Sequence, residues 1–172
     1  MTDIYRQIYE RISSLERRIA GLEVNEGHFL GCHVYRSTSQ NLSHSTNTPL
    51  SFDTELFDIG GFWDSASPTR FTIPVSGWYA AGGGWHMAPA NVVGDCRVAV
   101  HVYKNGSGFV SSQVVTTVVG KGTGISVAAT LYLADSDYIE IVAYQDMGAT
   151  KPTIAASSTH PTYCFGYITR IG

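Results

Sequence analysis

The fold is decided by the segment Phe71-Thr-Ile-Pro-Val-Ser-Gly-Trp-Tyr79, in which two apolar stretches flank a short turn. Pro74 and Gly77 favour a turn, because proline presets the backbone angle φ and glycine tolerates left-handed conformations. The aromatic and β-branched residues on both sides favour extended structure. The segment therefore predicts a strand at about 69–74, a tight turn and a second strand at 78–87.

The same type of pattern extends outward in both directions. From His28 to the end of the chain, apolar and polar residues alternate in short runs separated by turn residues. Asn105-Gly106 is the clearest hairpin turn. These signals predict an all-β sandwich or jelly roll, with strands at about 28–36, 49–58, 69–74, 78–87, 95–104, 109–119, 125–134, 138–146 and 162–171.

The N-terminal segment has a heptad repeat instead. Arg11-Ile-Ser-Ser-Leu-Glu16 recurs seven residues later as Arg18-Ile-Ala-Gly-Leu-Glu23. Arginine at position g and glutamate at position e pair between neighbouring chains of a parallel coiled coil, Arg11 with Glu16 and Arg18 with Glu23. The alternative is a single amphipathic helix packed on its own domain. The apolar a and d positions of the predicted coil are Tyr5, Ile8, Ile12, Leu15, Ile19 and Leu22.

The repeat leaves the number of chains in the coil open. Isoleucine at a with leucine at d favours dimers, whereas the Arg-apolar-x-x-apolar-Glu pattern resembles a motif of short parallel trimers. The coil is weak by itself, since it spans about three heptads and Gly21 costs about 1 kcal/mol relative to alanine. We expect a coiled-coil stalk at 1–26 and a head at 27–172 that support each other's association.

Composition narrows the range of partners. Only 15% of the residues are charged and the net charge is −3, which argues against partners held by charge, such as nucleic acid or an anionic membrane. No apolar run approaches the length of a membrane span, so we expect no membrane insertion. The N-terminus lacks the apolar segment of a secretory signal, and we expect none. Nothing in the sequence predicts a cofactor.

The β-rich region resembles the globular head of complement C1q, a relative of the tumour necrosis factor (TNF) jelly roll. Phe71–Tyr79 matches the family pattern Phe-x-x-Pro-x-x-Gly-x-Tyr. Two positions elsewhere in the chain depart from the family: Ser136 stands where the family usually has glycine, and Cys164 replaces a core aromatic residue. The resemblance implies a ten-stranded-type jelly-roll sandwich that assembles as a homotrimer, which favours three chains in the coil. Further matches, in order, are Phe52–Asp58, Val102–Gly106, Leu131–Val142 and Cys164–Ile168.

Jelly-roll topology also predicts where the loops lie. Successive strands alternate in direction, so the turns at 75–77, 105–107 and 134–137 are expected at the stalk end. The loops 37–48, 60–68, 88–94, 120–124 and 147–161 are expected at or near the far end, either as recognition loops or as tolerated insertions. Trp63 is the candidate anchor of an interface, or simply packs under its own loop. The candidate distal binding residues are Asn41, His44, Trp63, Asp64, Asn91, Lys121, Asp146, Lys151 and His160.

Three cysteines without a CxxC spacing argue against a zinc site and favour buried thiols that behave as small apolar residues. The alternative follows from the resemblance. The first and last strands of a jelly roll pair, which would place Cys32 and Cys164 on neighbouring strands, where a disulfide could join them. Cys96 would then lie on the other sheet.

Whether the protein binds a metal is left open. The six histidines show no ligand spacing, but a histidine on the axis of a trimer would occur three times and could bind a metal or an anion. Asp135 and Asp137 fall in a predicted stalk-side turn. Asp64, Asp95 and Asp146 are therefore the better candidates for an ion at the far end.

The chain contains none of the motifs HExxH, G-x-S-x-G or Walker A, so we expect no enzymatic activity. A short coil fused to such a head resembles bacteriophage virion proteins: capsid decoration proteins, head or neck fibres, and tail-tip adhesins. We therefore expect a trimeric virion protein, made in the host cytoplasm and attached to a larger virion assembly through its coil. Its head would bind a host-surface receptor or glycan. The alternative is a soluble cytokine-like or lectin-like ligand of cellular origin.

Overall fold

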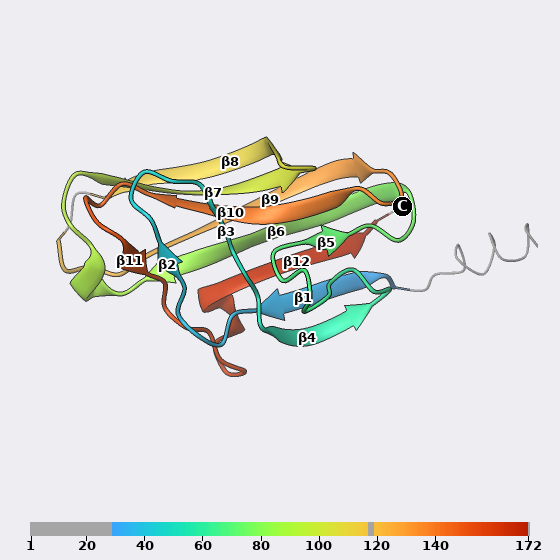
Figure 1. The fold of residues 1–172 in the computed structure, drawn as a ribbon, viewed down its shortest axis with the longest axis horizontal. Coiled ribbons are helices and arrows are strands. Elements are labelled where there is room, and N and C mark those ends of the chain that lie inside the picture. Colours follow the sequence, from blue (N-terminus) through green and yellow to red (C-terminus); the bar gives the residue numbers. More distant parts are fainter. Residues whose placement is uncertain (1–28, 117–118, 172) are drawn as a thin grey trace, which may run out of the picture.

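Two antiparallel sheets face each other across one hydrophobic core (Figure 1). The first sheet has the order β4 (Thr54–Ile59), β1 (Gly31–Tyr35), β12 (Cys164–Arg170), β6 (Gly77–Met87) and β9 (Thr123–Leu133). The second has the order β3 (Thr48–Pro49), β10 (Tyr138–Gln145), β7 (Cys96–Lys104) and β8 (Ser107–Thr116), with β5 (Phe71–Thr72) also paired to β10. The predicted all-β sandwich is confirmed.

This computed structural model describes residues 29–116 and 119–171. The coiled coil predicted for residues 1–26 lies outside the described residues. Two short helical turns, η1 (Pro89–Asn91) and η2 (Pro161–Tyr163), interrupt the loops. A small third sheet pairs β2 (Asn41–Leu42) with β11 (Lys151–Pro152). The sequence did not predict these two strands, because two-residue strands have no detectable alternation.

The core forms from the inward-facing positions of both sheets. Tyr79 and Trp85 of β6 are almost fully buried, and both polar groups are satisfied. The Tyr79 hydroxyl donates to the carbonyl of Val75 at 2.5 Å, and Trp85 Nε1 donates to the carbonyl of Ala99 at 3.0 Å. The second bond joins the two sheets directly, since Ala99 belongs to β7. Buried tyrosine and tryptophan are stable here because their donors have partners.

Two facing glycines make room for buried side chains of the core, Gly166 for two aromatic rings and Gly83 for Ile141. Gly83 of β6 lies opposite Gly166 of β12, and both face inward. A Cβ atom on Gly166 would lie 2.8 Å from the Phe71 ring and 2.9 Å from the Phe52 ring. Those two rings pack at a centroid distance of 5.8 Å. Any side chain at Gly166 would therefore displace residues that are at most 1% exposed.

The strand expected at 49–58 is divided between the sheets. Its beginning, β3, pairs with β10 of the second sheet, and its end, β4, pairs with β1 of the first. Leu50 and Phe52 lie between them and are buried in the core. The expectation of one continuous strand was wrong because burial of these side chains requires the chain to cross from one sheet to the other.

The cysteines lie on the strands expected for them, but the suggested bridge is wrong. Cys32 and Cys164 occupy the neighbouring strands β1 and β12, and Cys96 lies on β7 of the other sheet. Cys32 pairs with Ile168, four positions along β12 from Cys164, an offset of about 13 Å. A disulfide needs Cα atoms within about 7 Å. All three are buried free thiols, and burial raises the pKa of Cys164 to about 12.

Left-handed backbone conformations mark the turns at the end of the molecule where the described chain begins and ends. Asn105 and Gly106 have φ values of 50° and 77°, as the predicted hairpin requires. Ser136 has φ of 66° in the neighbouring turn. Asp137 joins the two turns: it accepts hydrogen bonds from Lys104 Nζ at 2.9 Å and Asn105 Nδ2 at 2.7 Å. The hydrogen bond from Lys104 is the main cause that lowers the pKa of Asp137 to about 2.

Replacing Ser136 by glycine should stabilise the head. A left-handed conformation costs a non-glycine residue about 1–2 kcal/mol, and the greater entropy of glycine in the unfolded chain offsets part of that gain. We expect Ser136→Gly to raise the free energy of unfolding by about 0.5–1 kcal/mol in urea titrations at fixed protein concentration. Ser65→Gly, in an exposed turn without a positive φ, is the control and should give no gain. A destabilised Ser136→Gly protein would contradict this explanation.

Candidate binding surfaces

The loops gather at the end of the sandwich opposite the chain termini (Figure 1). At the terminal end, the backbone N–H of Arg170 donates to the carbonyl of Leu30 at 2.9 Å, so the beginning and end of the described chain lie together. Strands β1, β6, β7, β9, β10 and β12 run between the two ends. Four loop segments reach this distal end, as the alternation of strand directions predicted: 37–48, 88–94, 120–124, and residues 147–156 of the loop expected at 147–161.

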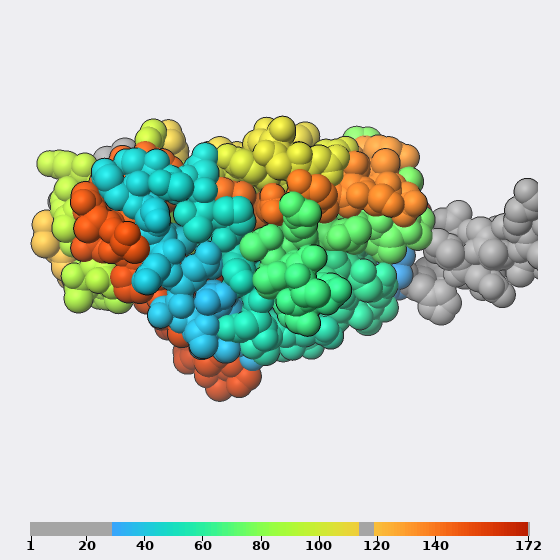
Figure 2. All heavy atoms as spheres, in the orientation of Figure 1, coloured from blue at the N-terminus to red at the C-terminus, as the bar shows by residue number. Residues whose placement is uncertain are grey.

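The buried side chain of Gln145 joins two of these distal loops. Its Nε2 atom donates to the carbonyls of Leu42 and Ala149, both at 2.9 Å, and its Oε1 atom accepts from the backbone N–H of Met147 at 2.7 Å. Gln145 is fully buried, so these bonds satisfy most of its amide in an apolar site. The loops 37–48 and 147–156 are therefore one ordered unit, and Figure 2 shows them side by side on the surface.

The sequence-predicted distal residues fall into separate groups. Asn41 and Lys151 lie close together on β2 and β11, whose register pairs Lys151 with Leu42. His44 accepts a hydrogen bond at its Nδ1 atom from the backbone N–H of Gly148 at 3.0 Å. His160 stacks on Tyr163 with ring centroids 5.3 Å apart, in a separate turn.

The other distal candidates also differ in their surroundings. Asn91 belongs to η1, and the Lys121 loop lies beside that turn, since a Cβ atom on Gly122 would lie 3.5 Å from Pro89. Lys121 is exposed. Asp146 lies 3.7 Å from Arg97 in an ion pair. The structure therefore gathers Asn41, His44 and Lys151 but brings no single cluster of all the candidates together.

The loop at 60–68 was misplaced, and with it Trp63 and Asp64. Strand β4 returns to the terminal end, where Ile59 pairs with Gly31, so the next loop begins at that end. Asp58 accepts hydrogen bonds from the backbone N–H groups of Phe62 and Trp63, at 3.0 and 2.9 Å, and these hold the loop down. The expectation overlooked that β4 runs antiparallel to β1, so the chain has already returned to the terminal end where this loop begins.

Trp63 packs under its own loop. Its Nε1 atom donates to the carbonyl of Pro68 at 3.3 Å, and its backbone forms a bridge with Phe71. The end of the same loop is tied to the second sheet, because Arg70 lies 3.4 Å from Glu140 and 4.2 Å above the Tyr138 ring. These contacts account for Trp63 as a packing residue, the alternative that the sequence left open.

Within residues 29–116 and 119–171, no three metal-ligating side chains converge as a metal site. Asp137 is engaged by Lys104 and Asn105, and Asp146 by Arg97. In the same part of the chain, no helix is both long and apolar enough to pass through a membrane.

The outer face of the first sheet carries a continuous line of rings, which we call the aromatic strip: Phe29, Phe57, His33, Phe165 and Tyr167. Neighbouring centroids along this strip lie 5.8, 6.3, 5.9 and 6.4 Å apart. The rings of Phe165 and Tyr167 lie over Gly84 and Gly82, where a Cβ atom would be 3.0 Å from each side chain. Glycine thus leaves room for these two aromatic side chains over the sheet.

His33 is the polar member of the aromatic strip. Its Nε2 atom is buried without a hydrogen-bond partner among the described residues. Burial lowers the pKa of His33 below 6.5, so the imidazole is mostly neutral at pH 7. Unsatisfied buried polar atoms are rare in folded proteins. The strip therefore offers apolar rings together with one unused hydrogen-bonding atom.

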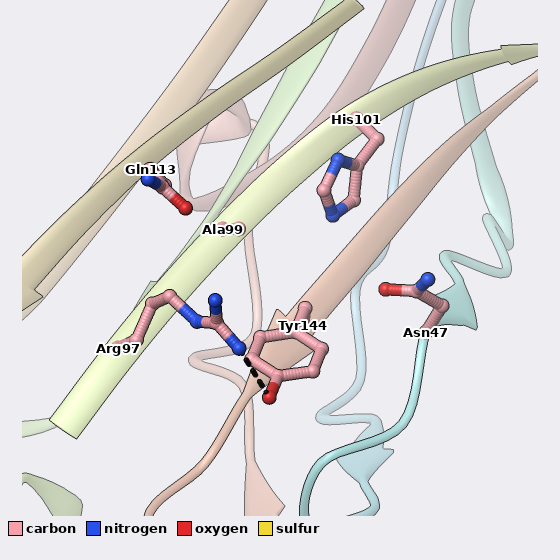
Figure 3. Close-up of a pocket in the computed structure, with 6 residues that line it drawn as sticks. All are labelled: Asn47, Arg97, Ala99, His101, Gln113 and Tyr144. Atoms are coloured by element: carbon pink, nitrogen blue, oxygen red, sulfur yellow. Dashed lines mark hydrogen bonds between the residues drawn. The ribbon is translucent and has the colours of Figure 1, made fainter. Parts of the chain in front are cut away.

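The outer face of the second sheet differs and contains a polar pocket that the sequence analysis missed. It lies between β7, β8, β10 and the loop before β3 (Figure 3), and is lined by Asn47, Arg97, Ala99, His101, Gln113 and Tyr144. One signal could have pointed to it: the outward positions of β7 carry Arg97, His101 and Tyr103 around the small Ala99. Sequence alone does not show which side chains on other strands lie beside them.

No protein-family model and no curated protein sequence matches the chain. Solved structures do match its fold. The globular domain of the zebrafish complement 1qA protein is 14% identical with a TM-score of 0.58, and covers 83% of this chain and 95% of that one. Eiger TNF from S. frugiperda is 11% identical with a TM-score of 0.61, at 84% and 93% coverage. Murine APRIL is 10% identical with a TM-score of 0.60, at 83% and 99% coverage. The head therefore has the jelly-roll fold of C1q and TNF proteins.

Proposed function

We propose that this chain is a non-enzymatic, homotrimeric binding protein of a bacteriophage virion. An N-terminal coil attaches it to a larger virion assembly as a capsid decoration protein, a head or neck fibre or a tail-tip adhesin. Its jelly-roll head meets a partner on the host surface or on the particle. The observation that carries the proposal is the aromatic strip on the first sheet, because it supplies the head with a surface for self-association.

The aromatic strip fits another copy of the chain. Phe29 is 50% exposed, and the rings of Phe57, Phe165 and Tyr167 are only partly buried. Contiguous exposed apolar surface is uncommon on monomers and typically marks an interface. Aromatic residues also dominate the energetics of interface cores. In the trimer, the unsatisfied His33 atom would meet a hydrogen-bonding group of the neighbouring chain.

The position of the chain ends supports attachment through the N-terminal segment. The first described residues enter β1 at the terminal end, and the Gln145-ordered loops lie at the other. A stalk at the terminal end leaves the distal loops free to meet a partner. Three copies on one trimer multiply weak contacts by avidity. The heptad repeat supports the same arrangement, since its arginine and glutamate positions pair between parallel chains.

A cytokine-like or lectin-like ligand of cellular origin is the second candidate. The observation that favours it is the shared fold with Eiger TNF and murine APRIL, at identities of 11% and 10%. The two candidates place the protein differently, on a virus particle or free in solution, and so can be separated by experiment.

Mass spectrometry of particles purified from the virus whose genome encodes the chain tests the virion role. We expect the protein to be present in a multiple of three copies per attachment site. Deleting residues 1–24 should remove it from the particles, because the coil provides the attachment, while the head stays folded by circular dichroism. Particles that lack the intact protein would contradict the virion role.

The coil and the aromatic strip should contribute separately to the trimer. Ile12→Asn with Leu15→Asn should weaken the coil, since each buried apolar side chain contributes about 1.5–3 kcal/mol, and leave the protein partly trimeric by analytical ultracentrifugation. Adding Phe57→Asp should then give monomers, because the charge would be buried in the strip. Phe109→Asp is the matched control: Phe109 is 54% exposed, but on the second sheet. A wild-type monomer or dimer, or an equal effect of Phe109→Asp, would contradict the proposal.

The trimer should weaken as the pH falls below about 6.5. Burial lowers the pKa of His33, and a neighbouring chain would bury it further, so the trimer binds fewer protons than the separated heads. By linkage, association is then favoured above this window and is lost as the pH falls through it. The same sedimentation experiment at pH 7.5 and 5.5 should show more dissociation at the lower pH. His33→Gln should flatten this dependence, and an unchanged dependence would show that other groups cause it.

A further inference from the structure

The polar pocket on the second sheet is a shallow depression of about 210 Å³. Its floor is Ala99, which is 3% exposed and is the only small residue among the outward positions Arg97, Ala99, His101 and Tyr103 of β7. The larger side chains form the rim around the floor (Figure 3). Pockets that enclose drug-sized ligands measure roughly 300–1,000 Å³. This one has room for a single small ring.

Charge within the pocket is already balanced. Arg97 donates from its Nη2 atom to the Tyr144 hydroxyl at 2.7 Å, and its guanidinium lies 4.7 Å from the centre of the Tyr144 ring. Its Nε atom lies 3.7 Å from Asp146, whose carboxylate also accepts from the Arg97 backbone N–H. The one cation of the pocket thus has a carboxylate partner. A neutral ligand fits this environment better than an anion, which would have to compete with Asp146.

The remaining polar groups keep hydrogen-bonding capacity for a ligand. Gln113 is exposed and makes no side-chain hydrogen bond to the described residues. Asn47 donates from Nδ2 to the Tyr103 hydroxyl at 2.9 Å, which leaves its Oδ1 atom free to accept. Burial, and then the nearby Arg97, lower the pKa of His101, so its neutral ring offers one donor and one acceptor. Planar groups that pair a donor with an acceptor match hydroxyl groups, which both donate and accept.

We propose that this pocket binds one neutral sugar ring, the terminal residue of an uncharged glycan. The hydroxyls of the sugar would bond to Gln113, His101 and Asn47, and its C–H face would lie on the Ala99 methyl group. The pocket opens on the face of the sandwich opposite to the aromatic strip, so a neighbouring chain that packs on the strip does not cover it. It therefore places glycan recognition on the side of the head, beside the distal loop 37–48, which supplies Asn47.

This inference rests on the binding role proposed above and names its ligand class. Failure of the sugar site can be distinguished from failure of the proposed role, because the two are measured by different experiments. Oligomeric state is measured by sedimentation, and sugar binding by nuclear magnetic resonance. A trimer that binds no neutral sugar would overturn only the sugar site.

The test uses saturation-transfer difference spectroscopy on the full chain. The probes are galactose, glucose, mannose, N-acetylglucosamine and N-acetylgalactosamine, with N-acetylneuraminic acid and glucuronic acid as charged comparisons. We expect at least one neutral sugar to bind and both acids to bind more weakly. An array of immobilised glycans then distinguishes a free monosaccharide ligand from a terminal glycan residue, since trimers gain avidity only on the array.

Two variants locate the site. Ala99→Leu fills the floor and should abolish binding. Gln113→Ala removes an exposed amide and should weaken binding roughly tenfold or more, as expected for one or two lost hydrogen bonds. Ala134→Leu, an equal enlargement at an exposed turn outside the pocket, is the control and should bind as the wild type does. If Ala99→Leu fails to fold, Gln113→Ala alone decides. Binding that survives Gln113→Ala, stronger binding of the acids, or no neutral sugar bound would each overturn the proposal.

Discussion

The close approach of β6 and β12 at Gly83 and Gly166 is the constraint on which the rest of the structure depends. Gly166 lets the rings of Phe52 and Phe71 lie against the first sheet from inside, and Gly83 opposite it leaves room for Ile141. Those two residues belong to segments that pass between the sheets: Phe52 between β3 and β4, and Phe71 at β5 of the second sheet. The same pair of rings therefore closes one side of the sandwich and holds both crossing segments in place.

Glycine has a second role on the other face of β6. Gly82 and Gly84 point outward and are covered by the rings of Tyr167 and Phe165 from β12. Alternation along β6 thus serves both faces: the inward Gly83 leaves room for Ile141 of the core, and the outward Gly82 and Gly84 support the aromatic strip. A flat, partly apolar outer face results, and its chemistry suits contact with another protein chain. The buried Nε2 atom of His33 adds a requirement for a specific partner atom on that face.

The outer face of the second sheet follows a different chemistry. Its outward side chains are mostly polar, and Arg97, Asp146 and Tyr144 satisfy one another. At this surface the small size of Ala99 matters more than its polarity, because it creates the depression that the surrounding groups line. With the functions proposed above, one sandwich would separate assembly from recognition, each on its own sheet. The ordering of the distal loops by Gln145 adds a third surface, whose partners are not defined by a pocket.

Local interactions make the positions of most strands and turns predictable from the sequence alone. Alternating residues placed most strands of the sandwich, because side chains of a strand point to opposite faces regardless of what they meet. Asn105-Gly106 marked its hairpin, since positive φ is a property of the residues themselves. The resemblance around Phe71–Tyr79 led to the jelly roll, and the pairing of β1 with β12 followed from it.

Only the tertiary structure decided which distant residues meet. The register of β1 on β12 separates Cys32 from Cys164, although both lie on the expected strands. The loop at 60–68 lies near the termini because burial of Phe52 and pairing of β4 set its starting point. The polar pocket combines Asn47, Gln113 and Tyr144 from three separate segments around β7. Each of these depends on register and packing between segments far apart in the chain, which a pattern of neighbouring residues does not encode.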